Sequence, residues 1–143
     1  MIMSLFKAIN ISGSGLTAQG FRMDVISQNI ANATTTRTAE GGPYRRKETI
    51  LRQQDVSFEE WLQNEEKATG VMVAATVADP SPFVQIYDPA HPDADEAGFV
   101  SMPNVDVTRE YVDLITASRA YEANITAINT AKQMARKALE IGR

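Results

Sequence analysis

The last quarter of the chain has the sequence pattern of one long helix. Residues 108–141 contain neither proline nor glycine, and apolar side chains recur in alternating steps of three and four residues, as in a coiled-coil seam. The seam positions are Tyr111, Leu114, Ser118, Tyr121, Ile125, Ile128, Lys132, Ala135 and Leu139. After Ile128 a second stripe that includes Met134 takes over, because a straight helix drifts by ~20° per heptad.

Such a helix would be ~50 Å long at ~1.5 Å per residue, whereas a compact chain of this length has a radius of gyration of ~15 Å. We therefore expect the helix to protrude and to pack against something outside its own core.

A second seam occupies the N-terminal third. Its positions are Ile2, Leu5, Ile9, Ser12, Leu16, Gln19, Met23, Ile26, Ile30 and Ala33. Gly13, Gly15 and Gly20 interrupt this predicted helix, and each costs up to ~1 kcal/mol relative to alanine. We expect the helix to be marginal alone and the glycines to permit a close approach to the C-terminal helix. The alternative is an ordinary amphipathic pair folded back on its own domain.

The middle of the chain reads as a small β-rich insert. A Thr- and Gly-rich loop follows Asn32, and then the pattern changes to the period of two that is typical of strands. Predicted strands cover Tyr44 to Arg52, the run from Val71 to Pro80, Phe83 to Tyr87, and Phe99 to Ser101. A capping box at Ser57 and Glu60 predicts a short helix, in which Trp61 would anchor a small core.

The predicted fold class is therefore α+β, with long N- and C-terminal helices paired as a coiled-coil-like unit around the β insert. We expect a discontinuous axial helical domain, formed by residues 1–36 and 105–143. Residues 37–104 would form an outer domain with a Pro- and Asp-rich loop at 88–98.

Composition excludes several classes of protein. The formal net charge is −4 and no dense Lys and Arg cluster occurs, so a nucleic-acid partner is not expected. The absence of cysteine excludes disulfides and thiolate metal sites. No apolar run approaches the ~20 residues of a membrane span, and the first residues lack the pattern of a cleavable signal peptide, so we expect neither direct membrane insertion nor conventional secretion.

One cluster invites a test for metal binding. His91 is flanked by Asp88, Asp93, Asp95 and Glu96, but the spacing matches no hard-metal loop and one imidazole falls short of a zinc site. We interpret the segment as a solvated, proline-stiffened loop whose carboxylates accept local backbone hydrogen bonds. No catalytic, cofactor-binding or metal-binding residue is assigned, and a small metal-dependent hydrolase using His91 stays a remote alternative.

The run Tyr44-Arg45-Arg46-Lys47 is a short basic cluster. It is either the solvated face of an edge strand or an electrostatic contact with an acidic neighbour, such as the acidic loop of an adjacent copy.

Several stretches together resemble bacterial flagellar basal-body rod proteins, most closely the FlgC type of the proximal rod. They are NIANATTTR, YRRK, YDPAHPDADEAGFVSMPNVDV and EYVDLITASRAYEANITAINTAKQMARKALEIG, and they cover most of the chain. The motif residues are Asn29, Asn32, Asp88, Pro89, His91, Pro92, Asp95, Gly98, Pro103 and Asn104.

This resemblance implies a structural protein rather than an enzyme. It implies a hollow, helically assembled drive shaft that spans the periplasm in the basal body, transmits torque and passes exported subunits. The implied partners are copies of the chain, related rod proteins, an export-side adapter and membrane-ring components, and the implied route is type III export without a cleavable signal. The alternative is another secreted coiled-coil or needle-like filament subunit.

Under this interpretation the two seams form the assembly interface. Its predicted residues are Leu5, Ile9, Leu16, Met23, Ile26, Ile30, Tyr111, Leu114, Tyr121, Ile125, Ile128, Met134 and Leu139.

Overall fold

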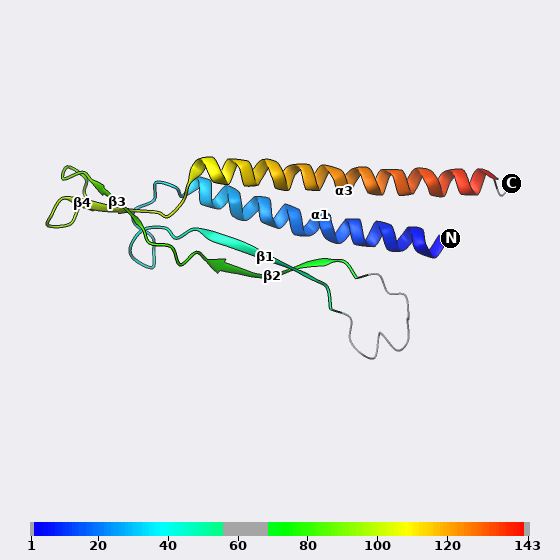
Figure 1. The fold of residues 1–143 in the computed structure, drawn as a ribbon, viewed down its shortest axis with the longest axis horizontal. Coiled ribbons are helices and arrows are strands. Elements are labelled where there is room, and N and C mark those ends of the chain that lie inside the picture. Colours follow the sequence, from blue (N-terminus) through cyan, green and yellow to red (C-terminus); the bar gives the residue numbers. More distant parts are fainter. Residues whose placement is uncertain (1, 56–68, 142–143) are drawn as a thin grey trace.

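Two long antiparallel helices dominate the computed structural model, which describes residues 2–55 and 69–141 (Figure 1). In chain order the elements are α1 (Ile2–Ala31), β1 (Lys47–Gln53), β2 (Val71–Ala78), β3 (Val84–Tyr87), β4 (Phe99–Met102) and α3 (Val107–Ile141). The α+β class with a β insert between terminal helices is confirmed.

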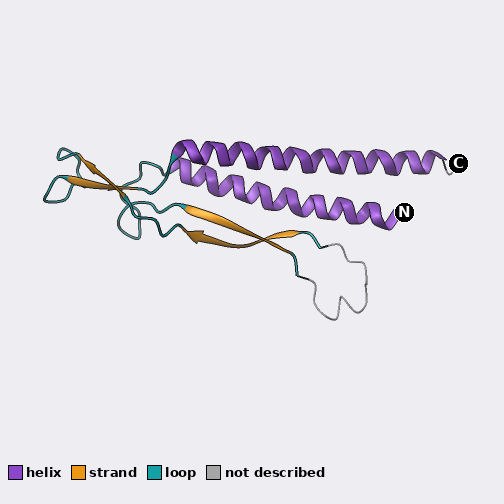
Figure 2. Ribbon diagram, in the orientation of Figure 1, coloured by secondary structure: helices purple, strands orange, loops and turns teal. Residues whose placement is uncertain are grey.

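The strands form two separate antiparallel hairpins, coloured orange in Figure 2. The β1–β2 hairpin pairs Lys47 with Ala78 and Gln53 with Val71, and its register shifts between Ile50 and Leu51. This hairpin lies along α1, whereas the β3–β4 hairpin lies beyond the end of the helix pair (Figure 1). The predicted capping box and Trp61 fall outside the described residues.

Asp106 fixes the start of α3. Its Oδ1 accepts hydrogen bonds from the backbone N–H of Thr108 at 2.9 Å and of Arg109 at 3.2 Å. This is the N-cap arrangement, in which a side-chain oxygen satisfies N–H groups that lack a partner within the helix.

Two rows of α3 side chains, each with a spacing of seven residues, face α1. One of them is a predicted row of the seam, and the other is shifted by one residue from the second predicted row. Leu114, Tyr121 and Ile128 are half-buried, as one row of the seam requires. The second row of contact runs through Glu110, Ala117, Asn124 and Ala131 instead of Tyr111, Ser118, Ile125 and Lys132. Small and polar residues fill this second row, so a search for apolar side chains passes over it.

The core is small because the helix contact is built largely from short side chains. Among the residues whose burial the structure describes, the buried apolar ones are Ala18, Val25, Ile26, Val100, Ala117 and Ala131. Many larger apolar side chains remain in contact with solvent along both helices. A chain that leaves this much apolar surface uncovered is suited to completion by neighbours.

Two glycines allow neighbouring elements to lie close to α1: Gly15 faces α3, and Gly70 precedes β2. Of these, the sequence predicted Gly15. A Cβ atom at Gly15 would lie 2.9 Å from Asn124 Oδ1 on α3, so a side chain here would push against the helix partner. A Cβ at Gly70 would overlap Ser14, whose Oγ accepts the Val71 N–H at 3.0 Å and joins β2 to α1. The expectation was wrong for Gly13 and Gly20, because nothing lies within 4 Å of a Cβ built at either position.

Alanine substitutions at Gly13 and Gly15 should differ in their effects on stability. Gly13→Ala should raise the free energy of unfolding by up to ~1 kcal/mol through helix propensity, because the side chain enters open space. Gly15→Ala should be less stable than Gly13→Ala by at least ~1 kcal/mol, because its methyl group displaces Asn124. Urea unfolding followed by circular dichroism measures both, and equal effects would contradict the packing of Gly15 on α3.

Candidate functional site

A buried polar junction joins α1, α3 and β1 where the helix pair meets the insert. Asn29, in the last turn of α1, is only 1% exposed. Its Nδ2 donates to Lys47 O at 2.8 Å and to Glu110 Oε2 at 2.9 Å, and its Oδ1 accepts from Lys47 N and Tyr44 Oη, both at 3.0 Å. An amide offers two donors and two acceptor positions, so this side chain is fully satisfied. It binds both backbone groups of Lys47, the residue that opens β1.

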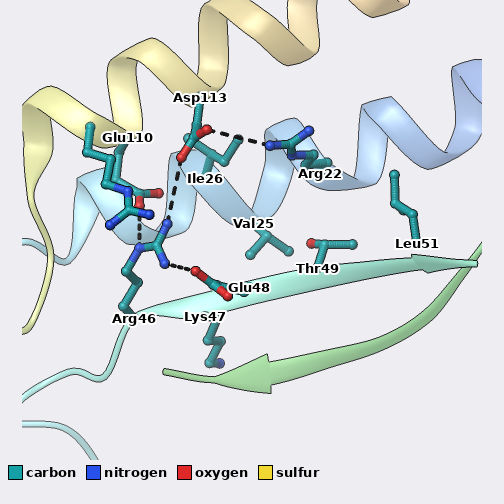
Figure 3. A pocket seen from close by; sticks show the side chains of 11 residues that line it. Arg22, Val25, Ile26, Arg46, Lys47, Glu48, Thr49, Leu51, Glu110 and Asp113 are labelled. Carbon is teal, nitrogen blue, oxygen red and sulfur yellow. Dashed lines mark hydrogen bonds and ion pairs between the residues drawn. The ribbon is translucent and has the colours of Figure 1, made fainter. Parts of the chain in front are cut away.

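Arg46 and Glu110 form the charged half of the junction. Glu110, in the first turn of α3, is fully buried, and Arg46 is 8% exposed. Arg46 Nε donates to Glu110 Oε1 at 2.5 Å, and Nη1 pairs with Glu48 and lies 3.4 Å from Asp79 Oδ2. Figure 3 shows that Arg46 also faces Asp113 of α3, at 3.7 Å from Nη2 to Oδ2.

The geometry determines the electrostatics of Arg46. Burial by itself disfavours the guanidinium charge, but hydrogen bonds and attraction from Glu110 and Glu48 outweigh it and raise the pKa of Arg46. A buried carboxylate such as Glu110 is tolerated only with close partners, and it has Arg46 on one oxygen and Asn29 on the other. The junction therefore specifies one arrangement of helices and hairpin.

Asn104 and Arg45 extend the junction toward β3. Asn104 Oδ1 accepts Arg46 N at 2.8 Å, and its Nδ2 donates to Asp79 O at 3.3 Å and Ser81 O at 3.2 Å. Arg45 Nη1 donates to the same two carbonyls, at 2.8 and 3.1 Å. The Ser81 hydroxyl and backbone, followed by Arg46, lower the pKa of Asp79.

These contacts correct the interpretation of the basic cluster. Arg46 is buried against acids of its own chain, and the Arg45 guanidinium lies 4.3 Å from the centroid of the Phe83 ring. Arg46 is therefore not a solvated charge, and the half-buried Arg45 is bound to groups of its own chain. The prediction failed because the acids that bind Arg46 come from β1, the segment after β2 and α3, which sequence spacing alone does not bring together.

An open cleft of about 420 Å³ lies beside the junction, between α1, the start of α3 and β1 (Figure 3). Val25, Ile26 and Leu51 form its apolar part, and its charged residues include Asp113 with Arg22 at 3.5 Å. Its carboxylates are Glu48, Glu110 and Asp113, and each lies against the Arg46 guanidinium. Arg22 and Arg46 pair with these acids of the lining, and the ion pairs hold the elements together.

Loop 88–98 is folded by its own carboxylates, as predicted. Asp95 Oδ1 accepts the N–H groups of Ala97 at 2.9 Å and Phe99 at 2.8 Å, and Asp88 Oδ1 accepts that of Ala90 at 3.2 Å. His91 Nδ1 accepts the Asp93 N–H at 3.1 Å. Within residues 2–55 and 69–141 no group of three or more His, Cys, Asp or Glu side chains is arranged to hold a metal ion.

Two motif residues have roles that explain their identity. Gly98 is buried at φ +83°, a conformation that side chains rarely adopt, and its carbonyl accepts the Asp88 N–H at 2.9 Å. Asn32 Nδ2 donates to Gln28 O at 2.9 Å, and its Oδ1 accepts the Thr35 hydroxyl at 3.2 Å, which shapes the chain as it leaves α1.

The residues of the predicted assembly interface fall into two groups. Tyr111, Met134 and Leu139 are 52%, 56% and 69% exposed, and Ile125 is also exposed. The half-buried members are Ile9, Leu16, Met23, Ile30, Leu114, Tyr121 and Ile128, and Ile26 is buried. The side chain of Leu5 is outside the described set. The single chain thus covers part of both seams and leaves part of the α3 seam free.

Comparison with known proteins assigns both helical ends of the chain to flagellar rod families. Residues 9–37 match the family described as flagella basal body rod protein, and residues 96–141 match the C-terminal family of flagellar basal body rod FlgEFG proteins. The flagellar basal-body rod protein FlgC of Borreliella burgdorferi is 48% identical, across 97% of this chain and 98% of the relative. The chain belongs to the FlgC family of flagellar basal-body rod proteins.

Other FlgC proteins cover the chain equally well. That of Bacillus subtilis is 45% identical across 99% of this chain and its own full length, and that of Salmonella typhimurium is 39% identical across 98% and 99%. The segments matched by the rod families contain Asn29 and Glu110, one in each, and Arg46 lies between them. No helix among the described residues is long and apolar enough to cross a membrane.

Sequence reasoning singled out Asn29 and Asn104 as motif residues but missed Arg46 and Glu110 as a pair. A usable signal existed for Glu110: it stands seven residues before Ala117 and so belongs to a heptad row with Ala117, Asn124 and Ala131. An acidic residue on the packed row of a helix requires a buried partner.

Asn29→Asp should destabilise the fold. The substitution replaces the donating amide by a carboxylate that faces Glu110 and the Lys47 carbonyl, and we expect a loss of about 3 kcal/mol in the free energy of unfolding. Asn10→Asp, at an exposed position of the same helix, serves as the matched control and should change stability by less than ~0.5 kcal/mol. Chemical denaturation measures both, and similar stabilities would refute the buried junction.

The Tyr44 phenol should titrate late. Burial, and then the negative charge of Glu110, raise its pKa above the ordinary value. The folded chain holds this proton more tightly than the unfolded chain, so its stabilising effect is complete below the ordinary pKa of about 10 and is lost as pH rises through the folded value. In an ultraviolet titration of phenolate absorbance, Tyr44→Phe should remove the last step. A last step that persists in this variant would contradict the assignment.

Proposed function

We propose that this chain is a structural subunit of the flagellar basal-body rod, in its proximal part. In that role it assembles helically with copies of itself and with related rod proteins into a hollow shaft that transmits torque and passes exported subunits. The observation that carries the proposal is the similarity to FlgC rod proteins at 39–48% identity over nearly the whole chain. The same observation favours the rod over a needle-like filament subunit.

The shape of the molecule supports an axial role. The antiparallel pair α1 and α3 forms a long narrow body, and α3 extends past the first residues of α1 (Figure 1). Tyr111, Met134 and Leu139 are exposed along α3. Apolar side chains at the surface of a long helix pair are suited to packing on the helices of neighbouring subunits.

The buried polar junction lies between the two proposed domains. Residues 1–36 and 105–143 would form the axial domain and residues 37–104 the outer domain. Arg46 of the insert donates to Glu110 of α3, and Asn104 accepts the Arg46 N–H, at the place where α1 ends and α3 begins. A rotation of the axial part would therefore be passed directly to the outer part.

Further partners follow from the proposed place in the rod. These are an export-side adapter and components of the membrane ring, reached after passage through the type III export apparatus without a cleavable signal. The small core supports this route, because a domain held by few buried side chains is easily unfolded for transport.

The proposal is tested by replacing the gene in a motile host. Cells that lack the chain should be non-motile and should carry an interrupted rod in cryo-microscopy, and the wild-type chain should restore both and copurify with basal bodies. Met134→Asp should fail to restore motility, because it puts a charge on the exposed apolar side of α3.

Gln133→Asp provides the matched control at the neighbouring exposed position and should restore motility. Both variants should unfold within ~0.5 kcal/mol of the wild type, since neither side chain is buried in the monomer. Full motility without the chain, or its absence from purified basal bodies, would refute the rod assignment. Full motility with Met134→Asp would refute the role of this surface alone.

A further inference from the structure

A row of exposed apolar side chains follows the first turns of α3, on a side of the helix that α1 does not cover. The row consists of Val107, Tyr111 and Ile115, at intervals of four residues, and we call it the apolar ridge. Residues at this interval are neighbours on a helix surface. The Tyr111 phenol makes no hydrogen bond within residues 2–55 and 69–141. Apolar side chains grouped in this way at a surface mark a contact with a partner.

The cleft beside the junction lies at the same level of α3 as the ridge but on its opposite side. Arg109 and Asp113 line the cleft, and each stands two residues from Tyr111 in the sequence. Two residues of an α-helix correspond to a rotation of about 200°, so both side chains project away from that of Tyr111. One molecule therefore carries the ridge and the cleft at one level, facing different neighbours.

The lining of the cleft suits an aromatic side chain with a polar end. Val25, Ile26 and Leu51 supply an apolar surface, and the volume of about 420 Å³ lies in the range of pockets that hold small ligands. Thr49 belongs to the same lining (Figure 3), and its hydroxyl oxygen is buried without a hydrogen-bond partner among the described residues. Buried hydroxyl groups are normally hydrogen-bonded, so this site gains from an incoming polar group.

We propose that Tyr111 of one copy enters the cleft of a second copy that lies beside it at the same level. The ring packs on the apolar part of the lining, and the phenol binds the Thr49 hydroxyl, since a phenol can both donate and accept a hydrogen bond. This deepens the proposed rod function and rests on it. The partner is a second copy, because the chain supplies both complementary surfaces and its own α3 keeps them apart within one molecule.

The proposed contact is heterologous and directional. Each copy presents its ridge to one neighbour and its cleft to the other, so copies follow one another sideways around a common axis without a large shift along it. Such a series closes into a ring or continues as a shallow helix, either of which suits a hollow shaft. Val107 and Ile115, one turn to either side of Tyr111, then pack on the rim of the cleft.

The absence of cysteine in the chain allows a direct test by cross-linking in purified basal bodies. Lys47→Cys places a thiol at the cleft, where the side chain is exposed and Asn29 binds only backbone atoms. Tyr111→Cys places a thiol on the ridge. With both changes in the full-length chain, a short bifunctional maleimide should give dimers, trimers and longer species. Each single variant should stay monomeric, because equivalent thiols of adjacent copies are a whole subunit apart.

The matched control combines Lys47→Cys with Asn129→Cys. Asn129 is exposed on the same side of α3 as Tyr111, about five helical turns and about 27 Å further along the helix. The control chain should give a yield of oligomers at least about tenfold lower than that of the Tyr111→Cys chain. Equal yields would overturn a contact at the level of the cleft.

A charge on the ridge provides a second measurement. Ile115→Asp in the two-cysteine chain should lower the yield of oligomers about tenfold, because the contact would bury a carboxylate, whereas Thr126→Asp, at an exposed position beyond the ridge, should leave it unchanged. Val107→Cys in place of Tyr111→Cys keeps the tyrosine and should give the same oligomers.

The contact is overturned if neither ridge thiol gives oligomers with Lys47→Cys, or if the yield is insensitive to Ile115→Asp. Recovery of the wild-type chain in purified basal bodies is a separate readout, so the rod assignment can stand while this contact fails.

Discussion

One buried arginine holds the molecule together. Arg46 leaves the start of the insert and enters a set of acids from β1, α3 and the segment after β2, and Glu110 gives it a fully buried partner. Neither residue is tolerated in its place without the other, since an uncompensated charge in the interior costs several kcal/mol. Asn29 ties the pair to α1 through Glu110 and to β1 through Lys47. The angle between the helix pair and its insert follows from these contacts.

The sequence predicted the elements well and their contacts in part. Both helices, all four described strands and the local hydrogen bonds of loop 88–98 follow from periodicity and turn chemistry, which are local properties. The row of α3 that contains Leu114 and Tyr121 was also readable, because it is apolar. The row that contains Glu110 and Asn124 was not, because its small and polar residues are stabilised by partners distant in the chain.

The same limit explains the outcome for the basic cluster and the glycines. Arg45 and Arg46 read as surface charges until the fold brings Asp79, Phe83 and Glu110 to them. Of the three N-terminal glycines only Gly15 is used for a close helix contact. Which glycine of a helix faces its partner depends on the register between the helices, and the junction at Asn29 and Glu110 fixes that register from one end.

The position of this junction has a mechanical consequence. Asn29 forms hydrogen bonds with both the N–H and the carbonyl of Lys47, so this contact with β1 does not depend on the side chain at position 47. The base of the β1–β2 hairpin is fixed to both helices, to the last turn of α1 through Asn29 and to the first turn of α3 through Glu110. A force on the hairpin therefore acts on both helices at once. Because Asn29 binds backbone atoms, the side chain of Lys47 can change while this contact stays the same.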